Sequence, residues 1–185
     1  MSRTVRRYLG SALAAALLTA CENGADRPAE QGTADAPGPI AVTSPAFADG
    51  AEIPQQYTCH GAGTSPPLEW TGVPPGSASI AVVVDDPDAP SGTFVHWVLV
   101  GLPADQGHLA EGAVPSGAHQ ARNSGGGLGW TPPCPPSGTH HYRFTVYAMG
   151  REPDVPDDAA PDAAVRAVQQ AAIAQGTLIG TVSAG

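Results

Sequence analysis

Three short apolar runs, each closed by glycine, proline or acidic residues, constrain the fold of this chain most strongly. They are Ser79 to Val84, Thr93 to Val100 and Tyr142 to Met149. Short runs rich in β-branched and aromatic residues, bounded by turn formers, are typical of β-strands. The 23 glycines and 20 prolines among 185 residues leave little room for long helices. The sequence therefore predicts a single, mainly β domain.

The three runs differ in their pattern of apolar residues. The first two are almost continuously apolar, as expected of strands that are buried on both faces. The third alternates, with Tyr142, Phe144 and Val146 on one side and Arg143 and Thr145 on the other. We expect the first side of that strand to face the core.

One helix is expected late in the chain, from Asp162 to Gln175. Its alanines and valines recur near helical spacing, acidic residues precede it, and Gly176 follows as a natural stop. A final strand, Thr177 to Val182, would then close the domain.

The first 39 residues carry a different signal. Arg3, Arg6 and Arg7 precede an apolar segment that ends at Ala20, and Cys21 follows. This pattern resembles a bacterial lipoprotein signal peptide over 1–20, with Cys21 lipidated; the alternative is an ordinary cleaved signal and a chance cysteine. Residues 21–39 have the composition of a disordered tether, so the folded domain would span 40–185.

These features predict a lipid-anchored protein of the bacterial cell envelope. Because Glu22, not aspartate, follows the cysteine, we expect the outer membrane, facing the periplasm, in a diderm organism. The formal net charge is −9 and the chain has no lysine, so a nucleic acid is a poor partner. Any anion that binds must be held locally.

Two histidines are expected to point inward. His96 lies in the second run, where strand alternation groups it with Phe94, Val98 and Val100. His140 enters the third run with the parity of Tyr142. A buried imidazole needs a hydrogen-bond partner, although a lone inward histidine is often only a satisfied core residue.

The stretch "DDPDAP", Asp85 to Pro90, follows the first run directly. Proline fixes its own φ and pushes the residue before it into an extended conformation, so this turn has few backbone options. The segment could be a solvated turn. It could also hold an aspartate at the point where the two inward histidines converge.

Three longer motifs strengthen the second interpretation. They are "IPQQYTCHGAGTSPPLEWTGVPPG" from Ile53, "VVDDPDAPSGTFVHWVLVGLP" from Val83 and "TPPCPPSGTHHYRFTVYAM" from Thr131. Together they resemble the phosphatidylethanolamine-binding protein family, in its bacterial branch related to Raf kinase inhibitor protein. The resemblance implies an antiparallel β-sandwich with one C-terminal helix. It also implies a small pocket for phosphate-bearing or other anionic groups, and no established catalytic activity for the family as a whole.

The resemblance also implies a set of ligand-binding residues. They are Asp86 and Asp88 of the "DPD" motif, His96, Pro135 and Pro136 at the pocket rim, His140 and Tyr142. The arginine that is usual after the last histidine is His141 here. Imidazole and phenol groups can donate hydrogen bonds to phosphate oxygens. Asp86 would instead orient and charge a histidine, or accept a hydrogen bond from a ligand's ammonium or hydroxyl group.

Four classes of function follow from these residues. The first is non-catalytic binding of a small anion or phospholipid headgroup, with no cofactor and no resident metal. The second, by fold analogy, is an inhibitor or regulator of a kinase- or protease-like protein partner. The third is a metal-dependent hydrolase that uses His96, His140 and Asp86. The last is a purely structural lipoprotein, which leaves the inward histidines unexplained.

The cysteines give one further expectation. With Cys21 lipidated, Cys59 and Cys134 remain, and export favours oxidation. We therefore expect a disulfide between two loops on the pocket side, with two separate thiols as the alternative.

Overall fold

A computed structural model of the chain describes residues 40–185. The expected signal peptide, the lipidation site at Cys21 and the tether lie outside the described residues. The described part contains two antiparallel sheets and a single helix, which confirms the expected fold class. None of the helical segments within 40–185 has the length and apolar character needed to cross a membrane.

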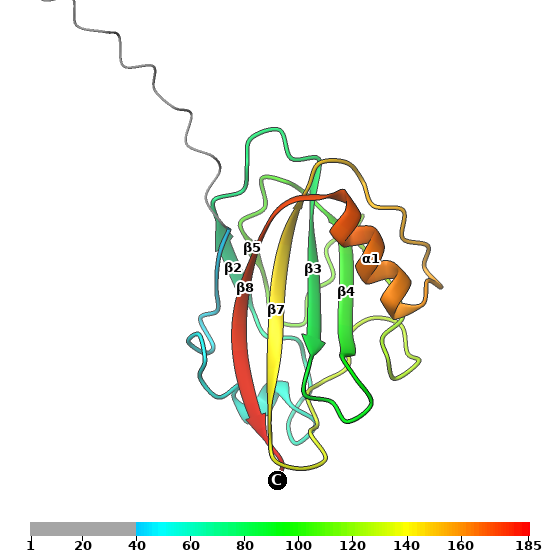
Figure 1. Ribbon diagram of the computed structural model, residues 1–185. Coiled ribbons are helices and arrows are strands. Elements are labelled where there is room, and N and C mark those ends of the chain that lie inside the picture. Colours follow the sequence, from blue (N-terminus) through cyan, green and yellow to red (C-terminus); the bar gives the residue numbers. More distant parts are fainter. Residues whose placement is uncertain (1–39) are drawn as a thin grey trace, which may run out of the picture. The chain divides into compact units, whose positions relative to one another are not determined.

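The larger sheet has five strands in the order β6-β4-β3-β7-β8 (Figure 1). Their bounds are β3 (Ser79–Asp86), β4 (Phe94–Leu102), β6 (His119–Gln120), β7 (Thr139–Met149) and β8 (Ala172–Ser183). The smaller sheet has the order β1-β2-β5, with β1 (Ala41–Thr43), β2 (Leu68–Thr71) and β5 (His108–Leu109). A short 3₁₀ helix, η1 (Gln55–Tyr57), and the helix α1 (Pro161–Ala171) complete the elements.

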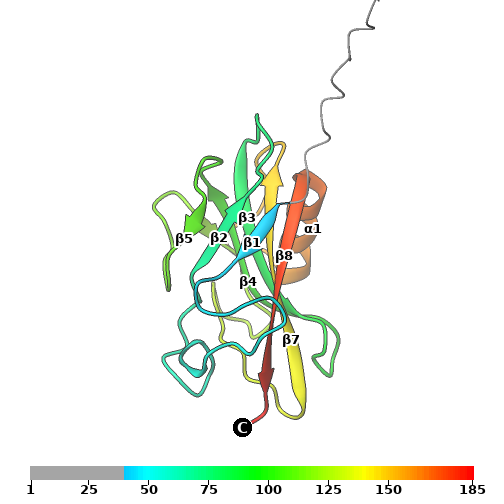
Figure 2. The same cartoon turned by 90° about the vertical axis from the view of Figure 1, so that its left-hand side faces the viewer.

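Apolar residues cover both faces of the larger sheet. One cluster lies between the two sheets and contains Trp97, Leu99 and Phe144. The other lies beneath α1 and joins Val98 and Tyr147 to residues of the helix. Figure 2 shows α1 and the smaller sheet on opposite sides of the larger one. This arrangement explains why β3 and β4 read as continuously apolar.

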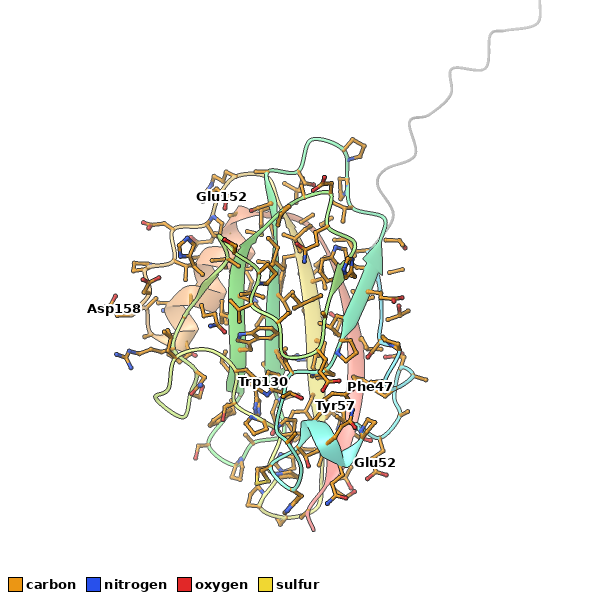
Figure 3. All side chains as sticks on the ribbon, turned by 180° about the vertical axis from the view of Figure 1, so that it is seen from behind. Phe47, Glu52, Tyr57, Trp130, Glu152 and Asp158 are labelled. Atoms are coloured by element: carbon orange, nitrogen blue, oxygen red, sulfur yellow. A yellow bond between two sulfur atoms is a disulfide. The ribbon has the colours of Figure 1, made fainter. Side chains whose placement is uncertain are left out.

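An aromatic group strengthens one end of the layer between the sheets. The ring of Phe144 lies 5.5 Å from that of Phe47 and 6.4 Å from that of Trp130. Figure 3 shows Phe47, Trp130 and Tyr57 gathered at this end. The same end carries the candidate site described below.

The expected helix boundary is wrong at its C-terminal end. The helix stops at Ala171, and Ala172 is already extended, with φ −71° and ψ 142°. From Ala172 onward the chain pairs with β7 along nearly its whole length. Gly176 therefore does not cap the helix: a Cβ there would overlap the carbonyl of Ile40, so the glycine allows the close approach of that segment. Tertiary pairing has overridden the local preference for helix.

The expected grouping of His96 with Val98 and Val100 is also wrong. The register between β3 and β4 shifts at this point, because Val84 pairs with Trp97 while the adjacent Asp85 pairs with Val95. His96 is the extra residue of this irregularity, so alternation breaks there. Val98 and Val100 pack beneath α1, whereas the ring of His96 lies 5.2 Å from that of Tyr142.

Candidate functional site

A cavity of about 350 Å³ lies where β3 ends and where β4 and β7 begin. These ends meet because the three strands are antiparallel neighbours, with β3 in the middle. The cavity is lined by Asp86, Ala89, Pro90, Phe94, His96, Thr131, Pro132, Cys134, Pro135, Pro136, His140 and Tyr142. Six of the seven residues expected to bind a ligand are among them.

Asp86 and His140 form a buried pair in the wall of the cavity. The His140 Nδ1–H donates to Asp86 Oδ2 over 2.7 Å, and the two side chains are only 8% and 5% exposed. The second oxygen of Asp86 accepts a hydrogen bond of 2.8 Å from the backbone N–H of Asp88. Both oxygens of the carboxylate are therefore engaged, and Asp86 orients the His140 ring.

His96 is fixed by a backbone carbonyl. Its Nδ1 lies 2.8 Å from the carbonyl oxygen of Thr131, and the N–H of Thr131 donates back to the carbonyl of His96 over 3.0 Å. Since a carbonyl only accepts, Nδ1 must carry the proton. Burial of the imidazole lowers the pKa of His96, and this outweighs the opposing effects of the Thr131 carbonyl and the nearby aspartates.

Tyr142 brings an unsatisfied donor to the cavity. The residue is fully buried, and its hydroxyl has no hydrogen-bond partner among the described residues. Burial raises the pKa of the phenol far above its usual value, so Tyr142 stays protonated. A buried hydroxyl without a partner costs roughly 1–3 kcal/mol.

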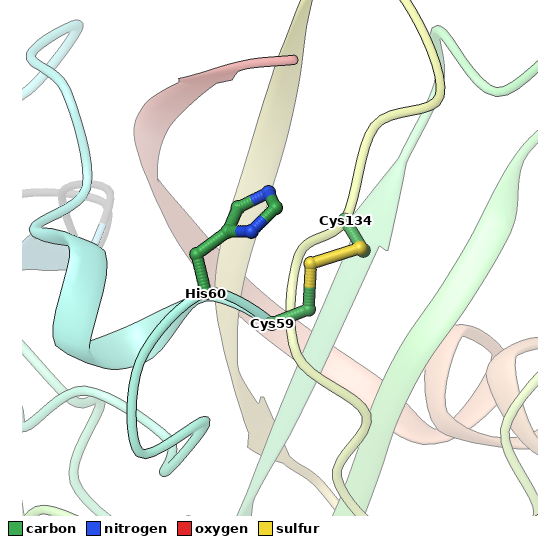
Figure 4. A group of neighbouring side chains, drawn as sticks. All are labelled: Cys59, His60 and Cys134. Carbon is green, nitrogen blue, oxygen red and sulfur yellow. A yellow bond between two sulfur atoms is a disulfide. The ribbon is translucent and has the colours of Figure 1, made fainter. Parts of the chain in front are cut away.

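The remaining wall is the proline-rich loop that runs from Thr131 to Pro136. Cys134 of this loop is joined to Cys59 by a disulfide with a Cα–Cα distance of 5.4 Å, as the sequence predicts (Figure 4). The N–H of Cys59 also donates to the carbonyl of Pro133 over 3.0 Å. The prolines and these bonds together leave the loop few alternative conformations.

His60 lies beside this disulfide. Cys59, His60 and Cys134 place their ligand atoms within 4.8 Å of one another, and no other such trio occurs among residues 40–185. The two sulfurs are bonded to each other, so neither is a thiolate that could bind a metal. Asp86, His96 and His140 do not bring their ligand atoms together in this way.

Asp88 is not among the residues that line the cavity. Its Oδ2 accepts hydrogen bonds from the backbone N–H and from Nδ1 of His141, at 2.8 and 2.7 Å. The bond from the His141 ring lowers the pKa of Asp88. Asp88 therefore holds the turn after β3 against the start of β7, and His141, the departure from the family pattern, also lies outside the cavity.

The structure adds Phe94 and Thr131 to the cavity, and neither is among the ligand-binding residues expected from the sequence. Phe94 packs its ring 4.7 Å from that of His96, and Thr131 selects the tautomer of His96. Phe94 shares strand parity with His96, which was a usable signal. No sequence signal could identify Thr131, because its contribution is a backbone carbonyl, which every residue has.

The chain is similar to known proteins over most of the described range. The family model for phosphatidylethanolamine-binding protein matches residues 43–183. A Mycobacterium tuberculosis protein named "Putative lipoprotein LppC" is 48% identical over 145 residues, which cover 77% of this chain and 72% of that protein. A Methanothermobacter thermautotrophicus protein is 41% identical over 145 residues, 76% of this chain and 96% of that protein.

Solved structures agree with this relationship. YbcL of Escherichia coli, described as a new member of the mammalian family, matches with a TM-score of 0.75 and 32% identity. The alignment covers 80% of this chain and 100% of YbcL. A homologue from Chlamydia trachomatis matches with a TM-score of 0.74 and 35% identity, covering 80% and 99% of the two chains. The chain belongs to the phosphatidylethanolamine-binding protein family.

Proposed function

We propose that this domain binds a small phosphate-bearing anion in the cavity and does not convert it. The observation that carries the proposal is that His96 and the buried pair of His140 and Asp86 line one small cavity. Because the Nδ1–H of His140 is bonded to Asp86, the Nε2 of this ring is the atom that can donate to a phosphate oxygen. His96 lies beside it, with its own Nδ1 bonded to Thr131.

The hydrogen bonds of Asp86 favour binding over metal-dependent hydrolysis. One carboxylate oxygen accepts from His140 Nδ1 and the other from the backbone of Asp88. Among residues 40–185, Asp86, His96 and His140 also do not form a cluster of neighbouring ligand atoms of the kind that a two-histidine, one-carboxylate metal site requires. Here the carboxylate serves to hold and orient the imidazole.

Local histidines are also what an anion site on this protein requires. The formal net charge of −9 repels anions at long range, so attraction has to come from groups inside the cavity. His140 beside the Asp86 carboxylate can carry both ring protons and donate from Nε2 to a bound anion.

Thermal unfolding with phosphate and with phosphoethanolamine tests this proposal. A ligand at a hundred times its dissociation constant stabilises the native state by about 2.7 kcal/mol. We expect both compounds to raise the Tm, and His140→Ala to abolish the rise. His108→Ala, an exposed histidine on β5, is the matched control and should respond as the wild type does.

The hydrolase alternative predicts a different result in the same assay. A divalent ion, and not phosphate, would then raise the Tm, and a chelator would reverse the rise. If neither phosphate nor a metal ion protects the wild type, the histidines are structural and the proposed function fails.

We also propose that the domain is held at the cell envelope by a lipid on Cys21. The lipobox-like sequence and the name of the LppC relative support this. The full-length chain expressed in a bacterial host should partition into the detergent phase of Triton X-114, and Cys21→Ser should remove it from that phase. Equal partitioning of the two proteins would contradict the proposal.

A further inference from the structure

The geometry of His96 points to a more specific ligand, and this inference rests on the proposed function. We propose that the cavity selects a phosphate monoester that still carries one proton, and discriminates against oxyanions that have none. His96 is the residue that determines this specificity, because its ring presents an acceptor, not a donor, to the ligand.

The acceptor follows from the bond to Thr131. Since Nδ1–H donates to that carbonyl, the lone pair of a neutral His96 resides on Nε2. Nε2 of His96 has no hydrogen-bond partner among residues 40–185. This atom remains accessible to solvent. His96 lines the cavity, and only 5% of the residue is exposed. The accessible lone pair on Nε2 therefore faces the cavity.

The surroundings of His96 keep the ring neutral near pH 7. Its closest neighbours are apolar or aromatic: the rings of Phe94, Trp130 and Tyr142 lie 4.7 to 6.4 Å away. The ionisable groups that face it are Asp86 from β3, with Asp85 behind it, and His140 and Tyr142 from β7. Asp86 is already bonded to His140, and Asp85 accepts two hydrogen bonds from Arg143.

His140 completes the pattern. An imidazole held between the Asp86 carboxylate and a bound anion donates from Nε2. The cavity therefore offers a donor from His140 and an acceptor from His96. An oxyanion that fits this set must itself donate one hydrogen bond, to His96.

A phosphate monoester near neutral pH meets this requirement. Its second pKa is about 6, so a monoanion with one P–OH group is present. A sulfate monoester and a phosphodiester also carry one negative charge but have no such proton. Against either of these, the His96 lone pair would face an unprotonated oxygen. The phosphate of an intact phospholipid is a diester, so the inference favours free phosphate or a monoester such as phosphoethanolamine.

Three methyl esters test the inference on the wild-type domain. Methyl phosphate, methyl sulfate and dimethyl phosphate are all small and anionic, and none has an ammonium group that could donate to His96 instead. At pH 6 we expect calorimetric titration to show methyl phosphate binding at least about tenfold more tightly than the other two. Above the second pKa of methyl phosphate, its affinity relative to that of the two control ligands should fall about tenfold per pH unit, because any change in the protein affects all three ligands alike.

The variant His96→Gln provides a second test. Its amide has both a donor and an acceptor, so it can bind an unprotonated oxygen, and the preference for methyl phosphate should fall towards unity. His108→Gln is the control and should keep the preference. Equal affinity of the wild type for all three esters would overturn this inference but leave the proposed function intact. Failure of every ester and of phosphate to bind would remove both.

Discussion

Two histidine–aspartate pairs sit side by side in this protein and differ in one respect. His140 and His141 are consecutive on β7, and each Nδ1 lies 2.7 Å from an aspartate of the "DPD" turn. The first pair is 8% and 5% exposed, whereas the second is 56% and 41% exposed. Strand alternation turns one pair into the cavity and the other towards solvent.

The equal distances show that geometry alone does not decide what a charged pair does. Water screens the outer pair and can replace either partner after a substitution. In the inner pair, each group depends on the other, since removing one leaves a buried polar group without its hydrogen bond. We therefore expect the inner pair to support both stability and ligand binding, and the outer pair to support neither strongly.

The largest effect should come from removing the inner histidine. His140→Ala leaves Asp86 Oδ2 buried without a donor, and breaking a buried pair in this way costs roughly 3 kcal/mol. His141→Ala is the matched variant one residue away, and its free energy of unfolding should equal that of the wild type within the error of the measurement. Urea unfolding of both variants checks the contrast. Similar losses for the two would show that burial is not what separates the pairs.

His96 sharpens the comparison because it is buried like His140 but bonds to a carbonyl instead of a carboxylate. Burial lowers its pKa in the folded protein below the usual value, so the unfolded chain takes up a proton first as the pH falls. The stability contributed by neutral His96 is complete above the unfolded pKa of about 6.5 and is lost as the pH falls towards the folded pKa.

The size of this effect follows from linkage. For each pH unit of acidification in which His96 is protonated in the unfolded chain but not in the folded protein, the free energy of unfolding falls by about 1.4 kcal/mol. His96→Asn retains a donor for the Thr131 carbonyl but cannot titrate. The difference in stability between wild type and His96→Asn should therefore shrink as the pH is lowered from 7 to 5. A difference that is constant over this range would contradict the lowered pKa.

The strands and the inward direction of His140 could be predicted from the sequence because they depend on local pattern. Apolar runs bounded by proline and glycine mark β3, β4 and β7, and the parity of His140 with Tyr142 places both in the cavity. The motifs that resemble the family supplied the rest of the site, and six of the seven named residues line one cavity.

What the sequence could not predict depends on contacts between distant segments. The sequence around Gly176 predicts a helix end, whereas in the structure this glycine allows the carbonyl of Ile40 to approach closely. The irregularity at His96 arises from pairing between β3 and β4, and the tautomer of His96 depends on Thr131, 35 residues away. Asp88 lies two residues from Asp86, yet it bonds outside the cavity because the turn points its carboxylate at His141.

The smallest effect is expected at position 141, where this chain has histidine in place of the arginine that is usual in the family. His141→Arg restores the usual arginine at a position that is 56% exposed and bonded to Asp88. Because the residue lies outside the cavity and water screens its charge, the affinity for phosphate should change by less than about twofold. Titration calorimetry at physiological ionic strength, with the wild type in parallel, measures this. A larger change would mean that the outer pair influences the ligand through Asp88 and the turn, so that the two pairs act together.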